Sequence, residues 1–312
     1  MNLIARQRSD MIREKALALG FDEVGFTTAE PLEEEGRFLE NWLEKGFHAG
    51  MDYMSRNVEK REHPARLVEG AKSVVVVLQS YTPPRDQKPG PLFKIARYAF
   101  GRDYHKVLKK RLKHLMKYVQ EEVSPGASGR FFVDSAPVSE RALAIRAGLG
   151  WRGKNTNLLH PRMGSYVFIG ELMLDVELTP ATPMREACGG CTRCIEACPT
   201  GALVGPYQLD ANKCISYHTI ENKEDIPGEL AGKFDGWIFG CDICQEACPW
   251  NWKARPHHEP DFNMRQAFEE MGKEDWLSLD EETFDELSKG SPLRRAGYKG
   301  MMRNLKFVTG DL

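Results

Sequence analysis

The distribution of cysteine constrains this chain more than any other feature of its sequence. All eight cysteines lie between Cys188 and Cys248, and the first 187 residues contain none. The first run, CGGCTRCIEACP, has the complete C-x2-C-x2-C-x3-C-P spacing of bacterial ferredoxins. The second run, FGCDICQEACPW, lacks its first cysteine, because the residue three positions before Cys241 is Ile238. This pattern indicates a small metal-binding module attached to a larger domain.

The spacing predicts how the cysteines divide between two clusters. In two-cluster ferredoxins the first three cysteines of a run bind one [4Fe–4S] cluster, and the fourth binds the other cluster. The second run then needs one more ligand, and Cys214 is the one cysteine left over. The predicted ligands are Cys188, Cys191, Cys194 and Cys248 for cluster 1, and Cys198, Cys214, Cys241 and Cys244 for cluster 2.

Two four-cysteine zinc sites are the alternative reading, since C-x2-C pairs often bind zinc. Two details favour iron–sulfur clusters: the third cysteine follows the second after two residues, and both runs end in Cys-Pro. Two adjacent clusters usually relay electrons, so the module implies a redox reaction elsewhere in the chain.

Composition leaves the partner open. The 43 Lys and Arg residues nearly balance the 45 Asp and Glu residues, so net charge does not indicate a polyanion-binding protein. The N-terminal segment resembles neither a signal peptide nor a twin-arginine leader, and no apolar run approaches the ~20 residues of a membrane span. We therefore expect a soluble, cytoplasmic protein with no membrane partner, in which cysteines are better metal ligands than disulfide partners.

The rest of the chain predicts an α+β fold. Strands are expected at 71–81, 129–137 and 165–178, and a helix between the last two, with Pro137 in its first turn and Gly148 at its C-terminal cap. The segment 178–183 is a plausible linker, and residues 262–287 have an acidic, helical pattern. The predicted domains are a mixed α/β catalytic domain (1–180), a ferredoxin-like two-cluster domain (181–255) and a short helical C-terminal segment (256–312).

The larger domain contains neither G-x-G-x-x-G after a strand nor a P-loop, so a Rossmann nucleotide site is unsupported. It does contain D-S-A-P from Asp134 and G-W-R-G-K-N-T from Gly150. Joined to two ferredoxin-type runs, these motifs resemble those of the tRNA epoxyqueuosine reductases. The resemblance extends from residues 20–26 through 50–57 and 71–81 to the second cysteine run, which is most of the chain.

This resemblance implies a cobalamin-dependent oxidoreductase that performs the last step of queuosine synthesis. Such an enzyme removes the epoxide oxygen of epoxyqueuosine at the wobble position of a tRNA, which takes two electrons and two protons. In the family the aspartate of the D-S/T-G/A-P motif supplies the acid, and the matching residue here is Asp134. From the residues alone, an Asp at a strand end before a proline-started helix is more commonly a cap or turn residue. A raised pKa would be needed for Asp134 to act as an acid at neutral pH.

The same resemblance implies a set of cobalamin contacts, which offer the donors and acceptors that corrin amides need. Arg141 reads equally as part of a solvated helix face, and Ile169 as a core strand position. Ser216 and Asp242 lie beside cluster cysteines, which favours cluster 2 as the one nearer the corrin. The implied contacts are Asn57, Arg97, Asp134, Ser139, Arg141, Lys154, Asn155, Thr156, Asn157, Leu158, Ile169, Ser216 and Asp242.

The family's partners would be a tRNA with a GUN anticodon and a low-potential donor such as a flavodoxin or ferredoxin, with the enzyme acting as a monomer. Residues 97–119 contain eight Lys or Arg against one acidic residue, with Tyr98, Tyr104 and His105 available to stack on a base. The other reading is a solvated helix whose Leu108, Leu112 and Leu115 pack inward.

Residues 293–306 are similar to the first helices of a HEAT-like domain, so a short or truncated region of that type is expected. Two other functions remain as alternatives. One is a cobalamin-dependent reductive dehalogenase, and the other is a ferredoxin-like electron carrier whose larger domain docks partners.

Overall fold

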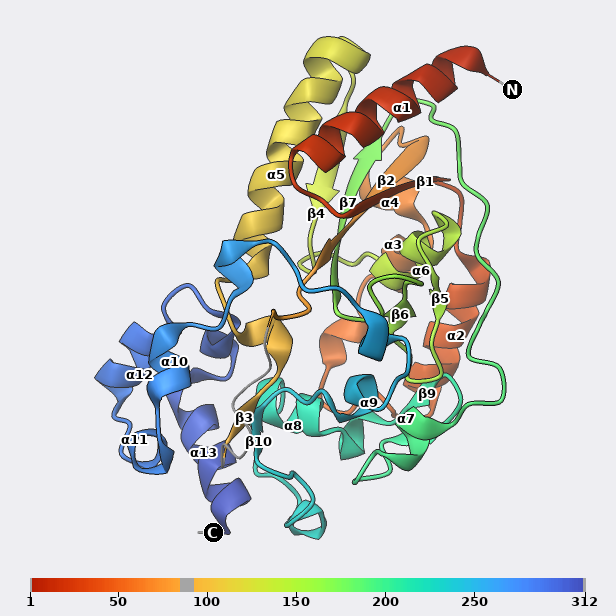
Figure 1. Cartoon of the computed structure of the whole chain (residues 1–312). Helices are drawn as coiled ribbons and strands as arrows, with labels where there is room; N and C mark the ends of the chain where they lie inside the picture. The colour runs from red at the N-terminus through yellow and green to blue at the C-terminus, as the bar shows by residue number, and fades with distance from the viewer. Residues whose placement is uncertain (1, 85–92, 311–312) are drawn as a thin grey trace.

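A four-stranded antiparallel sheet forms the centre of the larger domain in the computed structural model, which describes residues 2–84 and 93–310 (Figure 1). The strand order is β1 (Glu23–Thr28), β2 (Ser73–Ser80), β7 (Val167–Leu174) and β4 (Gly129–Phe132). The three strands predicted from the sequence are confirmed, although β4 ends five residues earlier than expected. The edge strand β1 was not predicted.

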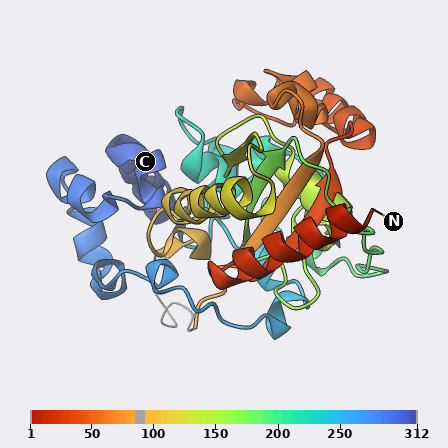
Figure 2. The same ribbon diagram turned by 90° about the horizontal axis from the view of Figure 1, so that it is seen from above.

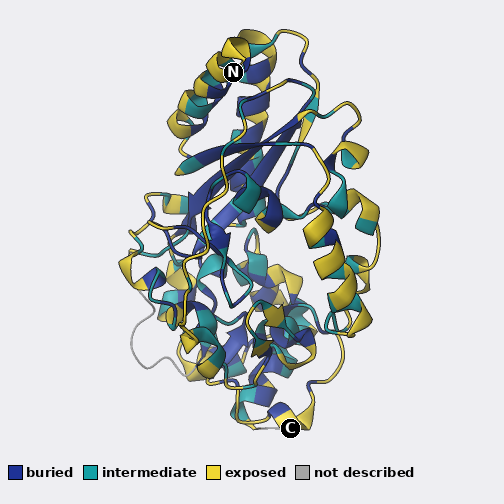
Figure 3. Cartoon of the chain, turned by 90° about the vertical axis from the view of Figure 1, so that its right-hand side faces the viewer, coloured by how far each residue is buried: buried dark blue, intermediate teal, exposed yellow. Residues whose placement is uncertain are grey.

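Helices cover both faces of this sheet. Alternate residues of β2 point to opposite faces, and all eight are buried because each face has its own hydrophobic core. Helices α1 (Leu3–Ala18) and α5 (Tyr104–Tyr118) lie together on one face (Figure 2). Helix α6 (Glu140–Arg146) packs on the other face. In Figure 3 the sheet is accordingly buried, while the outer sides of the helices are exposed.

The prediction that the leucines of the basic helix pack inward is confirmed. Leu108, Leu112 and Leu115 of α5 are fully buried against the sheet. Lysines at Lys106, Lys110, Lys113 and Lys117 remain exposed on the opposite side of the helix.

The helix predicted to begin near Pro137 begins instead at Glu140, so the placement of Pro137 in its first turn is wrong. The residues between β4 and α6 form a turn in which Asp134 has a positive φ of 45°. The predicted end is confirmed, since α6 stops just before Gly148, whose φ is 70°.

The cysteine region consists of short elements, among which α7 and α9 each follow the start of one cysteine run and contact each other. The remaining elements of the described chain are α2 (Glu33–Glu44), α3 (Val58–Glu62), α4 (Pro64–Leu67), β3 (Lys94–Ile95), β5 (Trp151–Arg152), β6 (Leu158–Leu159), α7 (Arg193–Glu196), β8 (Leu203–Gly205), β9 (Gln208–Leu209), α8 (Ile215–Ile220), β10 (Trp237–Phe239), α9 (Ile243–Glu246), α10 (Gln266–Glu270), α11 (Lys273–Leu277), α12 (Glu281–Ser288) and α13 (Gly297–Thr309).

The expected linker at 178–183 is fastened to the larger domain. The backbone N–H of Ala181 donates to the carbonyl of Phe26 in β1 (2.9 Å), and that of Thr179 donates to Ser9 Oγ in α1 (2.9 Å). The segment therefore continues along the sheet domain before it reaches the cysteines. Among the helices described, none is both long and apolar enough to cross a membrane.

The C-terminal helices share one hydrophobic core with the segment that precedes the second cysteine run. Strand β10 pairs in parallel with β3, and α13 packs against β10. The amide of Asn304 in α13 is fully buried and donates to the carbonyls of Ile238 and Thr219, each at 2.9 Å. This single side chain of α13 therefore links β10 to α8.

Replacement of this amide, Asn304→Ala, should destabilise the protein, because two buried carbonyls lose their donor at about 1–3 kcal/mol each. We expect a loss of about 2–4 kcal/mol and a lower midpoint of thermal unfolding. Lys306→Ala, at an exposed position of the same helix, is the control. Equal unfolding midpoints for the two variants would contradict this account.

Candidate active site and cluster-binding region

Electrostatic interactions relate the cysteines to one another in two sets. In the first group, Cys194 interacts electrostatically with Cys188 and Cys248, and Cys248 with Cys191. In the second group, Cys244 interacts with Cys214 and Cys198, and Cys241 with Cys244 and Cys214. Cys244 also interacts with Cys194 of the first group. This arrangement is compatible with the predicted ligand sets, which remain predictions.

The thiol environments suit iron–sulfur ligation. Burial raises the pKa of Cys214, and the backbone N–H groups of Ser216 and Tyr217 act in the opposite direction by hydrogen bonding to the sulfur. Cys241 and Ile243 repeat this arrangement in the second run. Within residues 2–84 and 93–310, no three His, Cys, Asp or Glu side chains form a group that could hold a single metal ion.

The structure explains why the second run lacks its first cysteine. Ile238 is fully buried in β10, where it packs into the core shared with the C-terminal helices. A ligand at this position would have to leave that core. Cys214, which immediately precedes α8, interacts with Cys244 of the second run instead.

The G-W-R-G-K-N-T turn connects the larger domain to both cysteine groups. The backbone N–H of Lys154 hydrogen-bonds to the sulfur of Cys188, and Asn155 Nδ2 donates to the carbonyl of Cys244 at 3.4 Å. Arg141 Nη1 donates to the carbonyl of Thr156 (2.8 Å), which ties the turn to α6. Thr156 itself has a positive φ of 69°.

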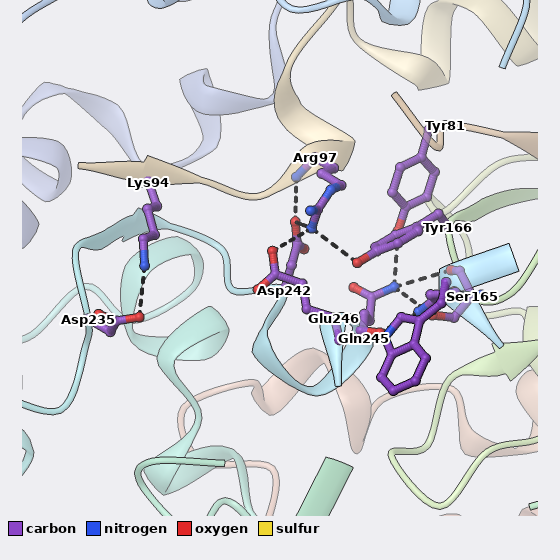
Figure 4. A network of polar contacts seen from close by, with 11 residues as sticks. Tyr81, Lys94, Arg97, Ser165, Tyr166, Asp235, Asp242, Gln245 and Glu246 are labelled. Carbon is purple, nitrogen blue, oxygen red and sulfur yellow. Dashed lines mark hydrogen bonds and ion pairs between the residues drawn. The ribbon is translucent and has the colours of Figure 1, made fainter. Parts of the chain in front are cut away.

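A buried ion pair joins the second cysteine run to the segment that follows β3 (Figure 4). Asp242 Oδ2 accepts from the Arg97 backbone N–H at 2.8 Å and lies 3.3 Å from Arg97 Nη1. The same guanidinium group contacts Glu246 Oε1 (2.7 Å) and the Tyr166 hydroxyl (3.1 Å). Burial raises the pKa of Asp242 to about 6, while the charge of Arg97 acts in the opposite direction.

Asp134 lies at the turn that follows β4, and two residues of α5 reach it. The Tyr104 hydroxyl donates to Asp134 Oδ2 at 2.6 Å, and His105 Nε2 lies 3.7 Å from the same oxygen. The Asp134 carboxyl group keeps 58% of its surface exposed, so it is open to a reactant. On the other side of the turn, Glu140 Oε1 accepts the Asp134 backbone N–H at 2.5 Å.

The protein's own groups do not supply the raised pKa that Asp134 would need to act as an acid at neutral pH. Partial burial raises the pKa, but hydrogen bonds from His105 and Tyr104 and the charge of His105 outweigh it and lower the pKa. Burial lowers the pKa of His105, yet hydrogen bonds to Asp103 and Asp134 raise it to about 9. At neutral pH the pair is therefore a carboxylate beside an imidazolium.

Sequence analysis missed Tyr104, His105 and Glu140 as partners of the acid. Of the residues that one reading of the basic helix offers to a base, Tyr104 is not available, because its buried ring stacks on Phe168 at 4.1 Å. Tyr104 and His105 lie 30 and 29 positions before Asp134, so the sequence gives little indication that they contact it.

Tyr98 connects the acid to the second cysteine group. Burial raises its pKa, and the charges of Asp134 and Asp242 both contribute to this increase. Tyr98 also packs edge-on against Tyr104, with ring centroids 6.4 Å apart. The predicted acid and the residue beside Cys241 therefore face the same region of the protein.

The other predicted cobalamin contacts differ in how far they are exposed to solvent. Asn57 is exposed with a positive φ of 56°, and Ser139 precedes α6. Leu158 is 3% exposed and Ile169 belongs partly to the core, so their contacts would be limited. Lys154 Nζ donates to the carbonyl of Gly189 at 2.5 Å. Ser216 and Asn157 are partly exposed.

A surface pocket of about 420 Å³ lies elsewhere, against α2. Phe38, Trp42 and Gln208 contribute to its wall, and none of the predicted site residues does. It has no part in the site described above.

The fold and these two groups of cysteines define an iron–sulfur oxidoreductase. Residues 187–251, which include every cysteine, match the family model of the 4Fe-4S double cluster binding domain. Residues 61–135 match the model described as Epoxyqueuosine reductase QueG, DUF1730. The iron–sulfur character predicted from the spacing is thereby confirmed.

An epoxyqueuosine reductase of Cellulophaga algicola is 45% identical over 302 residues, which cover 97% of this chain and 98% of the relative. This chain belongs to the epoxyqueuosine reductase family.

Solved structures agree. An epoxyqueuosine reductase crystallised with an epoxyqueuosine-modified tRNA-Tyr stem loop has a TM-score of 0.90 at 32% identity, covering 97% of this chain and 80% of that chain. The Bacillus subtilis enzyme, in a form whose catalytic aspartate loop is swung out of the active site, has a TM-score of 0.89 at 31% identity, covering 97% and 81%.

The ligand sets can be tested with Cys214→Ala. Loss of the second cluster should lower the iron content from about eight to about four atoms per chain. The content should fall below four if the first cluster is also damaged. Adding Ile238→Cys should not restore the lost iron, because position 238 faces the hydrophobic core. Iron and sulfide analysis with electron paramagnetic resonance after anaerobic purification measures both results. Unchanged iron in Cys214→Ala would refute the partition.

Proposed function

We propose that this chain reduces epoxyqueuosine to queuosine at the wobble position of a tRNA, with cobalamin bound between Asp134 and the second cysteine group. The observation that carries this proposal is the position of Tyr98, which packs against Tyr104, the hydrogen-bond partner of Asp134, and against the same hydrophobic cluster as Cys241. An acid and the exit of an electron path thus face one another. Epoxide removal needs both, because each turnover consumes two electrons and two protons.

The residues around this region fit a large amide-bearing cofactor. Arg141 is exposed, yet burial lowers its pKa, which is the behaviour of a side chain in a recess. The nearby turn from Gly153 to Asn157 presents backbone groups and amide side chains as donors and acceptors. Asn57, Ser139 and Ser216 add polar side chains with solvent access. Cobalamin, when bound, supplies a cobalt centre that accepts single electrons and acts as a nucleophile.

The chain's own acid would act on the epoxide oxygen. Asp134 is a carboxylate at neutral pH, so we infer that it relays a proton from His105 to the epoxide oxygen, to which its side chain is open. His105 is protonated at neutral pH and lies 3.7 Å from Asp134 Oδ2, so it can restore the proton that Asp134 gives up. Tyr104 fixes the direction of the carboxyl group through its 2.6 Å hydrogen bond.

The cysteine groups suggest a direction for the electrons. Cys191 of the first group is the exposed cysteine among the eight, so a low-potential donor such as a flavodoxin or ferredoxin would reach that group first. Electrons would then pass to the second group, where Cys244 interacts with Cys194. Cys241 and Asp242 stand at the end of this path, beside Tyr98.

The exposed lysines of α5 would bind the tRNA backbone. They share a helix with Tyr104 and His105, so phosphates bound there would lie near the acid. A structural relative binds an epoxyqueuosine-modified stem loop, which supports a tRNA substrate for this chain.

The deciding experiment is a conversion assay with anaerobically purified protein, cobalamin, a chemical reductant and an epoxyqueuosine-containing anticodon stem loop. We expect queuosine by mass spectrometry, and a cobalamin spectrum that changes when the protein is added. Iron without cobalamin binding or conversion would favour an electron carrier. Halide release from a haloarene without RNA conversion would favour a dehalogenase.

Asp134→Ala should keep both clusters and cobalamin binding but lose turnover by about 100-fold or more, because the proton donor is missing. Asp175→Ala, which removes a carboxyl group from the far end of β7, is the matched control and should keep near-normal turnover. The measurement is single-turnover conversion with iron and cobalamin content determined in parallel. Near-normal turnover in Asp134→Ala would remove the assigned role.

A further inference from the structure

Glu171 is a carboxyl group buried in the middle of the sheet with no conventional partner. It lies on β7 opposite Phe132 of β4 and Val76 of β2, and its exposure is 0%. Neither of its oxygens meets a hydrogen-bond donor among residues 2–84 and 93–310. An ionised carboxylate without donors is costly at such a position, so this residue requires an explanation.

The group that faces Glu171 is the carboxyl group of Glu140. Two carboxylates repel, but a protonated Glu171 can donate a hydrogen bond to Glu140, and the two side chains are within hydrogen-bonding reach. Burial, followed by the charges of Glu140 and Asp134, raises the pKa of Glu171 well above its usual range. Burial and the charge of Asp134 also raise the pKa of Glu140, to about 8. The pair therefore keeps a proton at neutral pH.

Several charged groups act on this pair from neighbouring elements. Arg141 from α6, His105 from α5 and Arg61 from α3 interact with Glu140 and favour its charged form. Asp134 acts in the opposite direction on both glutamates, and Tyr104 interacts with Glu140. Among the described residues these cations act on Glu140, whereas the charges that act on Glu171 are those of Glu140 and Asp134, so within the pair the proton belongs on Glu171.

Glu140 has a second contact, which leads to the acid. Its Oε1 accepts the backbone N–H of Asp134 at 2.5 Å. Asp134 holds a φ of 45°, a left-handed conformation that a non-glycine residue keeps only when surrounding contacts favour it. Glu140 supplies that contact, and the orientation of Glu140 depends on the hydrogen bond from Glu171.

We propose that Glu171 and Glu140 share a proton and act as a latch that holds the Asp134 turn in its working position. Glu171 is thus a positioning residue that acts through Glu140, two contacts away from the reacting atoms. The proposal rests on the proposed function for its kinetic consequences, although the latch itself is a property of the free protein.

The geometry favours positioning over proton delivery. Glu140 contacts the backbone N–H of Asp134, and a hydrogen bond to an amide carries no proton to Oδ2. His105 already lies beside that oxygen. The latch should therefore tolerate Glu171→Gln, whose amide also donates a hydrogen bond to Glu140, and should fail in Glu171→Ala.

The test compares these two variants in the cluster-loaded protein. For Glu171→Ala we expect kcat to fall by about 10–100-fold, with KM within about threefold of wild type, because the acid is displaced while the substrate surface is intact. Hydrogen exchange at the Asp134 amide, corrected for its intrinsic rate, should lose about tenfold or more of its protection. Glu171→Gln should retain both properties.

The pH dependence of amide exchange at Asp134 distinguishes the effect of the glutamate pair from that of His105. In wild type, protection of the Asp134 amide should persist through about pH 8, where Glu140 ionises and Glu171 still holds the pair's last proton, and should fall at the higher pH where Glu171 ionises and the two glutamates repel. In Glu171→Gln the protection should persist at that pH. His105 is present in both proteins, so the difference belongs to the pair.

Glu122→Gln on an exposed part of the chain is the control for substitution alone, and iron content and thermal midpoint report folding. If Glu171→Ala fails to fold, Glu171→Gln still decides through its exchange at high pH. Wild-type protection and kcat in Glu171→Ala would overturn the latch, as would an equal loss in Glu171→Gln. Because exchange is measured without substrate, failure of the conversion assay in wild type would count against the proposed function and leave the latch to be judged on its own.

Discussion

The buried contact between Arg97 and Asp242 is the interaction on which the arrangement of the site depends. A charge pair with this little solvent access is costly to separate, because each partner would remain buried without the other. Arg97 follows β3 and Asp242 lies inside the second cysteine run, so their contact fixes the run against the larger domain. Tyr166, at the start of the sheet strand β7, contacts the same guanidinium group and extends this link to the central sheet.

Carboxyl groups that interact with one another in this protein have opposite electrostatic environments. Asp134 accepts hydrogen bonds and faces an imidazolium, which favours its charged form. Glu140 and Glu171 lose water and face other carboxyl groups, which favours their neutral forms. Such divergence between neighbouring acids is common where proton transfer occurs, because each group is suited to a different protonation state.

The sequence predicted most successfully where a local rule applies. The cysteine spacing anticipated the double-cluster character of residues 187–251, since ferredoxin runs follow a fixed pattern. The valine run of β2 and the leucines of α5 also behave as their periodicity indicates. The edge strand β1 was missed because its short sequence, EVGFTT, has a glycine at its centre.

Tertiary proximity explains what the sequence did not predict. Tyr104 and His105 belong to α5, and their relation to Asp134 exists only because α5 crosses the end of β4. The same holds for Glu171, which reads as one polar position in an apolar strand until its contact with Glu140 is known. For this reason the sequence does not predict whether the pKa of Asp134 is raised or lowered, because the direction of the shift depends on these partners.

The way α13 closes over β10 also affects the order in which this protein can mature. The second cysteine group has β10 on one side, and β10 is held by Asn304, more than fifty residues after the last cysteine. A chain emerging from the ribosome exposes all eight thiols before this support has been synthesised. The sheet domain can fold early, whereas the compartment around Cys241 is completed last, so the second cluster should be the one whose assembly waits for the whole chain.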